Sequence, residues 1–253
     1  GWIRGGKSFV SISIANMLCK IFPGSRGAIV RKDLPTLKRN TIPTFNKIKP
    51  KPFFGEIKKD DWICKSSNGS EIIFFTESIK DDPDLNRWKG LELNWIVFEE
   101  ANEMQEKTFW KGVERTGTWF IKGLEVQPPI LIILTCNPSQ NWVKTLFYEP
   151  WAAGTLKAPF YFLQATAEDN PHISKELKES WESMPEAEYR RFVKGDWNVT
   201  DDPKQLIKWE WVKECESIIE DSPNEFSMGI DVAREGDDRT VFLIMKGDNL
   251  FKI

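Results

Sequence analysis

The sequence has few of the residues that build zinc sites, disulfide frameworks or membrane spans. Its 253 residues include one histidine, His172, and four cysteines that lie far apart and form no C-x-x-C pair. This excludes the usual zinc-site spacings and favours reduced, buried thiols. The longest apolar run, residues 130–134, is too short to cross a bilayer, and no signal segment opens the chain. We therefore expect a soluble, intracellular protein with no membrane partner.

A strong net charge is also lacking, but the basic residues are unevenly distributed. The formal net charge is −3, yet residues 31–59 contain nine Lys and Arg against Asp33 and Glu56. Residues 35–48 are only loosely helical in pattern, and Pro43 interrupts them. Their basic side chains either contact DNA phosphates or form a solvated face. The candidates are Lys38, Arg39, Lys47, Lys49 and Lys51.

The first eight residues complete the pattern G-x-x-x-x-G-K-S, which is typical of a phosphate-binding loop. In such a loop the backbone N–H groups point inward at the phosphates, Lys7 supplies positive charge and Ser8 supplies a magnesium ligand. Residues 9–22 carry spaced apolar side chains and no proline, so a helix should follow and add its dipole to the site. An ordinary Gly-rich turn before a helix is the alternative. The predicted nucleotide-binding residues include Gly1, Gly5, Gly6, Lys7 and Ser8.

Two later segments read as buried strands that end in chemically useful side chains. Residues 95–98 are apolar and run into Glu99 and Glu100. We assign Glu99 to a magnesium ion and Glu100 to the attacking water; solvent-exposed acids at a strand end are the alternative. The apolar residues 130–134 run into Thr135 and Asn137, which could sense a γ-phosphate or simply form an Asn-Pro turn.

The remaining pattern predicts an α/β fold with a mainly parallel central sheet flanked by helices. A short strand is expected at residues 27–30, and residues 62–64 and 71–75 should form a β-hairpin around an Asn-Gly turn. Helices are expected at residues 101–116 and 186–194. Nothing precedes Gly1, not even a methionine, so we expect a fragment that lacks the first strand of this fold.

Taken in order, these motifs resemble the large subunit of phage terminase, the ATP-driven motor that packages viral DNA. Besides the phosphate loop and the twin glutamates, the resemblance includes Leu37-Lys38-Arg39, Thr135-Cys136-Asn137-Pro138 and Gly195-Asp196-Trp197. It implies a P-loop ATPase domain at residues 1–199, a linker at 200–225 and, at 226–253, the first hairpin of an RNase H-like nuclease domain. Asp231, at the end of a strand, would be the first of several carboxylates that hold Mg²⁺ or Mn²⁺.

The resemblance also implies ligands, partners and a cellular location. ATP and Mg²⁺ would be bound at the loop, with Arg4 as a charge on the γ-phosphate. Arg87 and Arg115 are candidate fingers from a neighbouring subunit, but a surface or helix-packing role is the favoured alternative for each. Expected partners are double-stranded DNA, a small terminase subunit, a portal ring and further copies of the chain in a ring. The expected location is the host cell cytoplasm, at the procapsid. A helicase-like ATPase and a DNA- or capsid-binding module that does not hydrolyse nucleotide are the alternatives.

Overall fold

The computed structural model describes residues 6–166, 169–181, 183–199, 225–232, 240–247 and 249–252. The chain divides into two compact units, Gly1–Val199 and Thr200–Ile253. Gly1, Arg4 and Gly5 of the predicted phosphate loop lie outside the described residues, as do residues 200–224 of the predicted linker. Each unit is therefore described by itself.

The larger unit is built on a six-stranded sheet in the order β2-β3-β4-β1-β5-β6. Its four parallel strands are β4 (Glu71–Thr76), β1 (Arg26–Arg31), β5 (Trp95–Glu99) and β6 (Leu131–Thr135). The sheet continues antiparallel through β3 (Ile63–Ser66) and β2 (Phe54–Lys58). The predicted mainly parallel sheet and the predicted hairpin are confirmed, whereas β2 was not foreseen.

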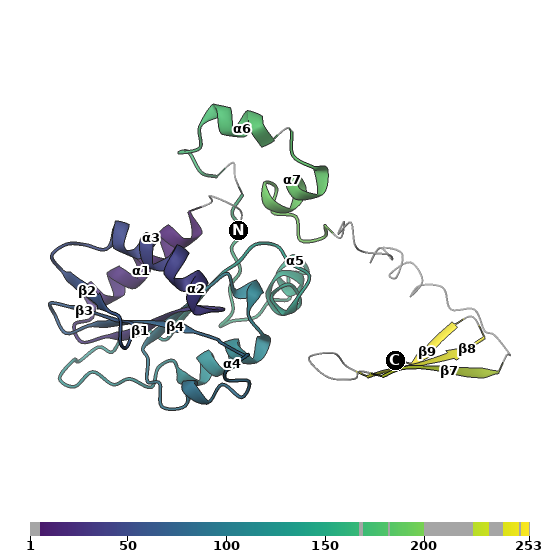
Figure 1. Ribbon diagram of the computed structural model, residues 1–253, viewed down its shortest axis with the longest axis horizontal. Coiled ribbons are helices and arrows are strands. Elements are labelled where there is room, and N and C mark those ends of the chain that lie inside the picture. Colours follow the sequence, from purple (N-terminus) through teal and green to yellow (C-terminus); the bar gives the residue numbers. More distant parts are fainter. Residues whose placement is uncertain are drawn as a thin grey trace. The chain divides into compact units, whose positions relative to one another are not determined.

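Helices cover both faces of this sheet (Figure 1). One face carries α1 (Lys7–Ile21), α2 (Leu34–Thr36), the π-helical turn η1 (Leu37–Thr41) and α3 (Ile42–Ile48), and the other carries α4 (Glu106–Arg115). Trp95 and Val97 of β5 therefore pack toward α1 and α3, while Ile96 and Phe98 pack toward α4. Burial on both faces explains why β5 is continuously apolar instead of alternating with polar residues.

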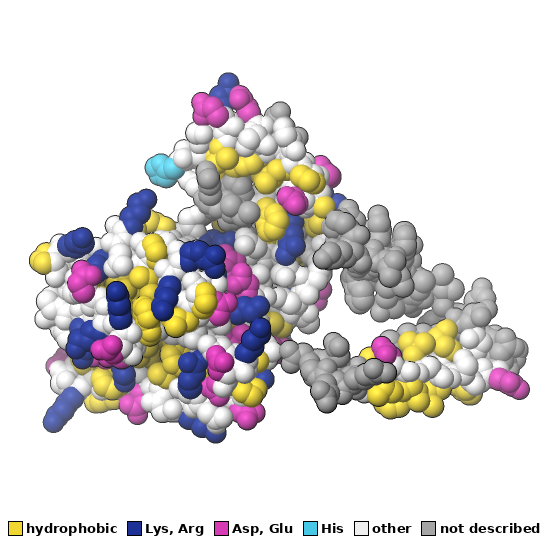
Figure 2. All heavy atoms as spheres, in the orientation of Figure 1, with side chains coloured by type: hydrophobic (Ala, Val, Ile, Leu, Met, Phe, Trp, Pro, Cys, Tyr) yellow, Lys and Arg dark blue, Asp and Glu magenta, His cyan; other side chains and the backbone are white. Residues whose placement is uncertain are grey.

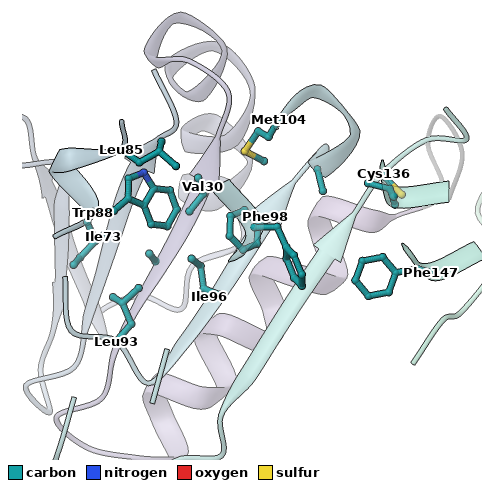
Figure 3. Close-up of a cluster of buried hydrophobic side chains, with 14 of the residues drawn as sticks. Val30, Ile73, Leu85, Trp88, Leu93, Ile96, Phe98, Met104, Cys136 and Phe147 are labelled. Carbon is teal, nitrogen blue, oxygen red and sulfur yellow. The ribbon is translucent and has the colours of Figure 1, made fainter. Parts of the chain in front are cut away.

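The core on the α4 side is centred on Trp88, in the short helix η2 (Asn86–Trp88). Its indole is fully buried and stacks on Phe98 with ring centroids 6.2 Å apart and an interplanar angle of 11°. Figure 3 shows Leu85 and Trp88 gathered beside Val30 of β1. Gly112 lets α4 approach this core, because a Cβ at that position would lie 2.4 Å from Phe98 Cζ.

Several sequence predictions were wrong in detail. The helix expected at 101–116 is divided into η3 (Ala101–Glu103) and α4, because Met104 between them has extended backbone at φ −103°, ψ 159°. Trp110 of α4 is apolar but 43% exposed. Val10 of α1 is likewise exposed, and Ile130 precedes β6, whose own residues are only partly buried. Apolar character alone did not identify which of these side chains the fold covers.

After β6 the larger unit continues with the short helices η4 (Lys144–Tyr148), α5 (Glu149–Ala152), α6 (Lys175–Trp181) and α7 (Glu186–Phe192). The last two pack together around Trp181 and Val193 in a small cluster of their own. The predicted helix at 186–194 is therefore present and packs against α6.

The described residues of the smaller unit form an antiparallel sheet of β7 (Phe226–Asp231), β8 (Val241–Lys246) and β9 (Asn249–Lys252), in that order. Asp231 is the last residue of β7 and pairs with Val241. The turn residues 236–239 lie outside the described part of the chain. In neither unit does a described helix have the length and apolar character needed to span a membrane.

Candidate nucleotide-binding site

The parallel strands of the larger unit end in a row of polar residues. Arg31 of β1 pairs in register with Thr76 of β4, and Glu99 of β5 pairs with Thr135 of β6. Strands β1 and β5 are themselves paired in register one residue earlier, at Val30 and Phe98. The row therefore lies at the carboxyl edge of the sheet, which is where open α/β folds bind their ligands.

Lys7 is the first residue of α1 and reaches the residues that follow β5 and β6. Its Nζ donates to Asn137 Oδ1 at 2.5 Å and lies 3.5 Å from Glu100 Oε1. Asn137 Nδ2 in turn donates to Glu100 Oε2 at 2.9 Å. Gly6, which precedes Lys7, has a left-handed backbone with φ 75° and no Cβ to oppose it. Lys7, Glu100 and Asn137 thus form one contiguous group.

Burial dominates the electrostatics of Lys7. Removal of water lowers the pKa of its ammonium group from the ordinary 10.5, and the nearby Glu100 carboxylate opposes that shift. Burial also raises the pKa of the Cys136 thiol, next to Asn137 in the chain. A partly desolvated cation at a helix N-terminus gains more from a bound anion than an exposed lysine would.

Glu100 is held in an uncommon backbone conformation. Its φ of 53° and ψ of 55° lie in the left-handed region, which residues with a Cβ seldom occupy. Its backbone N–H donates to Thr135 Oγ1 at 3.4 Å, so the end of β6 supports the turn after β5. The conformation directs the two consecutive glutamates differently: Glu100 contacts Lys7, while Glu99 is 2% exposed within the fold.

The two carboxylate oxygens of Glu99 have different surroundings. One carboxylate oxygen, Oε2, accepts a hydrogen bond from Thr41 Oγ1, but the other, Oε1, is buried and has no hydrogen-bond partner among the described residues. Ser8 follows Lys7 in the first turn of α1 and is partly buried. A carboxylate and a hydroxyl oxygen suit Mg²⁺, so these residues fit the predicted ion. No group of three or more His, Cys, Asp or Glu side chains in the described part of the chain is arranged to hold a metal.

Sequence reasoning missed several residues that build the site. Asn102 of η3 accepts from the Asn137 N–H at 3.3 Å through Oδ1, and its carbonyl accepts from Asn141 Nδ2 at 2.7 Å. It therefore ties the segment after β6 to the turn after β5. Arg31 is buried and its Nη2 lies 3.4 Å from Glu103 Oε2. The only sequence signal for either residue was its place beside a strand end.

Other predicted residues have different surroundings. Lys49, expected on a basic surface, is 6% exposed and donates to the Gly55 carbonyl at 2.7 Å. The candidate finger Arg87 donates to the Thr76 carbonyl at 3.3 Å, and Arg115 pairs with the adjacent Glu114. Both arginines thus have partners within their own chain. Asp231 lies in the smaller unit.

Comparison with known proteins finds a matching family model and similar solved structures. A model of the phage terminase large subunit family matches residues 47–196, more than half of the chain. The chain is similar to the large terminase from a thermophilic bacteriophage, with 19% identity and a TM-score of 0.61 over 97% of this chain and 58% of that one. The ADP complex of that terminase gives 20% identity and a TM-score of 0.61, over 96% and 58% of the two chains.

A mutant ATPase domain of the Thermus phage P74-26 large terminase is also similar, with 17% identity and a TM-score of 0.53 over 78% of this chain and 86% of that domain. At these identities the similarity shows a shared fold. The chain spans about 58% of the length of the first terminase, and no curated protein matches it. The family match covers β2 to β6 and includes both Glu100 and Asn137, which contact each other. This match shows that the chain belongs to the phage terminase large subunit family.

Proposed function

We propose that the larger unit hydrolyses ATP and that the intact protein uses the energy to move double-stranded DNA into a viral procapsid. The observation that carries the proposal is the contact of Lys7 with both Glu100 and Asn137 at the carboxyl edge of the parallel sheet. Membership of the terminase large subunit family supports the role of a packaging motor. It also disfavours a plain helicase and a module without nucleotide turnover.

Lys7 binds the terminal phosphates of ATP in this proposal. It lies at the N-terminus of a 15-residue helix, where the backbone dipoles add to its charge. In the structure the counter-charge of its ammonium group is Glu100, whose Oε1 lies 3.5 Å from Lys7 Nζ. Phosphate oxygens carry more negative charge than one carboxylate, so bound ATP replaces Glu100 as the main partner of Lys7.

That replacement frees Glu100 to act on water. Its Oε1 atom is the one that faces Lys7, whereas Oε2 stays bonded to Asn137. Once Lys7 turns to phosphate, Oε1 is available to orient a water molecule and to accept its proton. Asn137 contacts both partners, so it transmits the presence of phosphate at Lys7 to the carboxylate of Glu100, with Thr135 supporting the same turn.

Glu99 and Ser8 are the residues that would hold Mg²⁺. When bound, the ion neutralises charge that develops on the phosphate oxygens. The unpartnered Oε1 of Glu99 supports this assignment, since a buried carboxylate oxygen without a donor is costly unless a cation or a proton donor faces it. Glu99 is one methylene longer than the Asp common at this position, which allows either direct or water-bridged contact. Arg4 supplies a further charge on the γ-phosphate.

The smaller unit begins the nuclease of the intact protein. The antiparallel pairing of β7 and β8, with Asp231 at the end of β7, supports an RNase H-like start in which Asp231 binds Mg²⁺ or Mn²⁺. Cleavage requires further carboxylates besides Asp231, and we assign nuclease activity to the intact protein. A small terminase subunit, a portal ring and a ring of further copies complete the machine, at the procapsid in the host cytoplasm.

Replacement of Lys7 by alanine tests the ATPase assignment. We expect Lys7→Ala to lower the ATP turnover of the intact protein by about 100-fold or more, because it removes a charge that stabilises the transferring phosphoryl group. Lys65→Ala is the matched control, since this lysine is 56% exposed and pairs with Glu71 on the surface of the sheet. Wild-type turnover by Lys7→Ala, with phosphate release measured directly, would overturn the proposal.

A further inference from the structure

Residues 34–48 form one helical segment, made of α2, η1 and α3, whose two faces differ in chemistry. The inner face carries Leu37, Thr41 and Phe45, each at most 1% exposed. Leu37 and Phe45 pack in the apolar cluster that includes α1. Thr41 is the polar residue between them, so its hydroxyl group requires a partner inside the fold.

That partner is the carboxylate of Glu99. Thr41 Oγ1 donates to Glu99 Oε2 and leaves Oε1 buried and unpartnered. A donor on one oxygen fixes the rotation of the carboxylate and so determines which oxygen remains for a cation. Thr41 therefore controls the geometry of a residue that we assign to Mg²⁺, although it lies 58 residues away in the sequence.

The π-helical turn accounts for the placement of Thr41. The turn η1 ends at Thr41, and Pro43 lies in the first turn of the helix that follows. Proline has no N–H and its ring crowds the carbonyl four residues earlier, which a wider turn relieves. Such turns occur often at functional sites, and this one ends at the residue that contacts Glu99.

The outer face of the same segment is basic. No Asp or Glu occurs from residue 34 to residue 55, and Lys38, Arg39 and Lys47 are exposed. The Lys38 Nζ lies 4.8 Å from the ring centroid of Trp62, which places its charge beside the hairpin. Lys and Arg side chains are spread over the visible face of the larger unit, with acids between them (Figure 2). A stretch of this length without acids suits the phosphate backbone of nucleic acid.

We propose that residues 34–48 couple DNA to the metal ligand of the ATPase site: Lys38, Arg39 and Lys47 contact DNA phosphates, and Thr41 passes the resulting shift of the segment to Glu99. The inference rests on the proposed ATPase function and deepens it. Thr41 is a positioning residue, since it acts through its hydrogen bond to Glu99.

The inner contact is tested by the binding of Mn²⁺, used in place of Mg²⁺, to the intact protein with ADP, followed by electron paramagnetic resonance. Thr41→Val keeps the volume and removes the hydroxyl, and should weaken Mn²⁺ binding about tenfold, as loss of such supporting groups does at other metal sites. Thr41→Ser should restore wild-type affinity. Thr44→Val is the matched control, because its hydroxyl donates to the Asn40 carbonyl of the same segment.

The outer contact is tested by the salt dependence of DNA binding. Removal of one phosphate contact should reduce the slope of log K against log salt by about 0.9. We expect that change for Lys38→Ala, Arg39→Ala and Lys47→Ala, and none for Lys122→Ala, an exposed lysine outside the segment. Unchanged slopes in all three variants would contradict the proposed contact of these residues with DNA phosphates.

The coupling itself is tested by measuring Mn²⁺ affinity with and without DNA. We expect DNA to change Mn²⁺ affinity in the wild type and to leave it unchanged in Thr41→Val, because coupling between two sites requires a physical link. An equal DNA effect in both proteins would overturn the inference while leaving the ATPase intact. A wild type that binds neither Mn²⁺ with ADP nor ATP would overturn the ATPase assignment, and this inference with it.

Discussion

Replacement of Asn137 by alanine separates the roles of Lys7 and Glu100 from that of the amide that joins them. In the wild type the amide accepts from Lys7 Nζ at 2.5 Å and donates to Glu100 Oε2 at 2.9 Å. Asn137→Ala leaves the lysine and the glutamate in place, 3.5 Å apart, and removes the amide that contacts both. The variant therefore tests whether the nucleotide signal passes through Asn137.

The size of the effect follows from the two hydrogen bonds. Each involves a charged group and is worth about 1.5–3 kcal/mol. The side chains of Lys7 and Glu100 are 14% and 22% exposed, so water replaces part of what is lost. We take the net loss from the transition state as about 2 kcal/mol, which corresponds to a roughly 30-fold fall in kcat.

The assay is steady-state ATP hydrolysis, with nucleotide affinity measured separately. We expect Asn137→Ala to lower kcat and to change nucleotide affinity by no more than about threefold, because phosphate binding depends mainly on Lys7. Asn137→Asp should be at least as slow, since it places a second carboxylate against Glu100. Asn86→Ala, which removes an exposed asparagine bonded to Lys89, serves as the control. Wild-type kcat in Asn137→Ala would refute the role of this amide.

Two further predictions concern stability. Burial lowers the pKa of Lys7, so as the pH rises the folded chain loses this proton before the unfolded chain does. The stability of the wild type relative to Lys7→Met should therefore increase between that lowered pKa and 10.5. Thermal melts across this pH range measure the difference in stability, and a decrease would contradict the prediction. Gly112→Ala should reduce the free energy of unfolding by about 1–3 kcal/mol despite the better helix propensity of alanine, because its Cβ would collide with Phe98. Denaturant titration measures this free energy. A stabilised variant would contradict the prediction and would show that α4 can move away from Phe98.

The sequence alone was sufficient to predict the central strands and the polar side chains at their ends. The strands β1, β5 and β6 are short runs of apolar residues, and such runs indicate burial on both faces of a parallel sheet. Because parallel strands end at the same edge, the polar residues Glu99, Glu100 and Thr135 had to lie together. The contact between Lys7 and Glu100 follows from that reasoning, once α1 begins at the same edge.

Other features depend on packing between distant segments, which no local pattern encodes. The strand β2 is largely exposed and carries Gly55 and Glu56, so its sequence does not resemble a strand. Lys49 looked like a surface lysine, but its stem is buried and its ammonium group has a backbone partner. Thr41 had no local signal of function, because its role is defined by Glu99 on another element.

Replacement of Glu100 by glutamine tests the central claim most directly. Glutamine keeps the shape of the side chain but carries no charge and accepts no proton from water. We predict that Glu100→Gln binds ATP as tightly as the wild type and hydrolyses it at least about 100-fold more slowly, the range expected when general-base catalysis is lost. Equal rates of ATP hydrolysis by the two proteins would contradict the account.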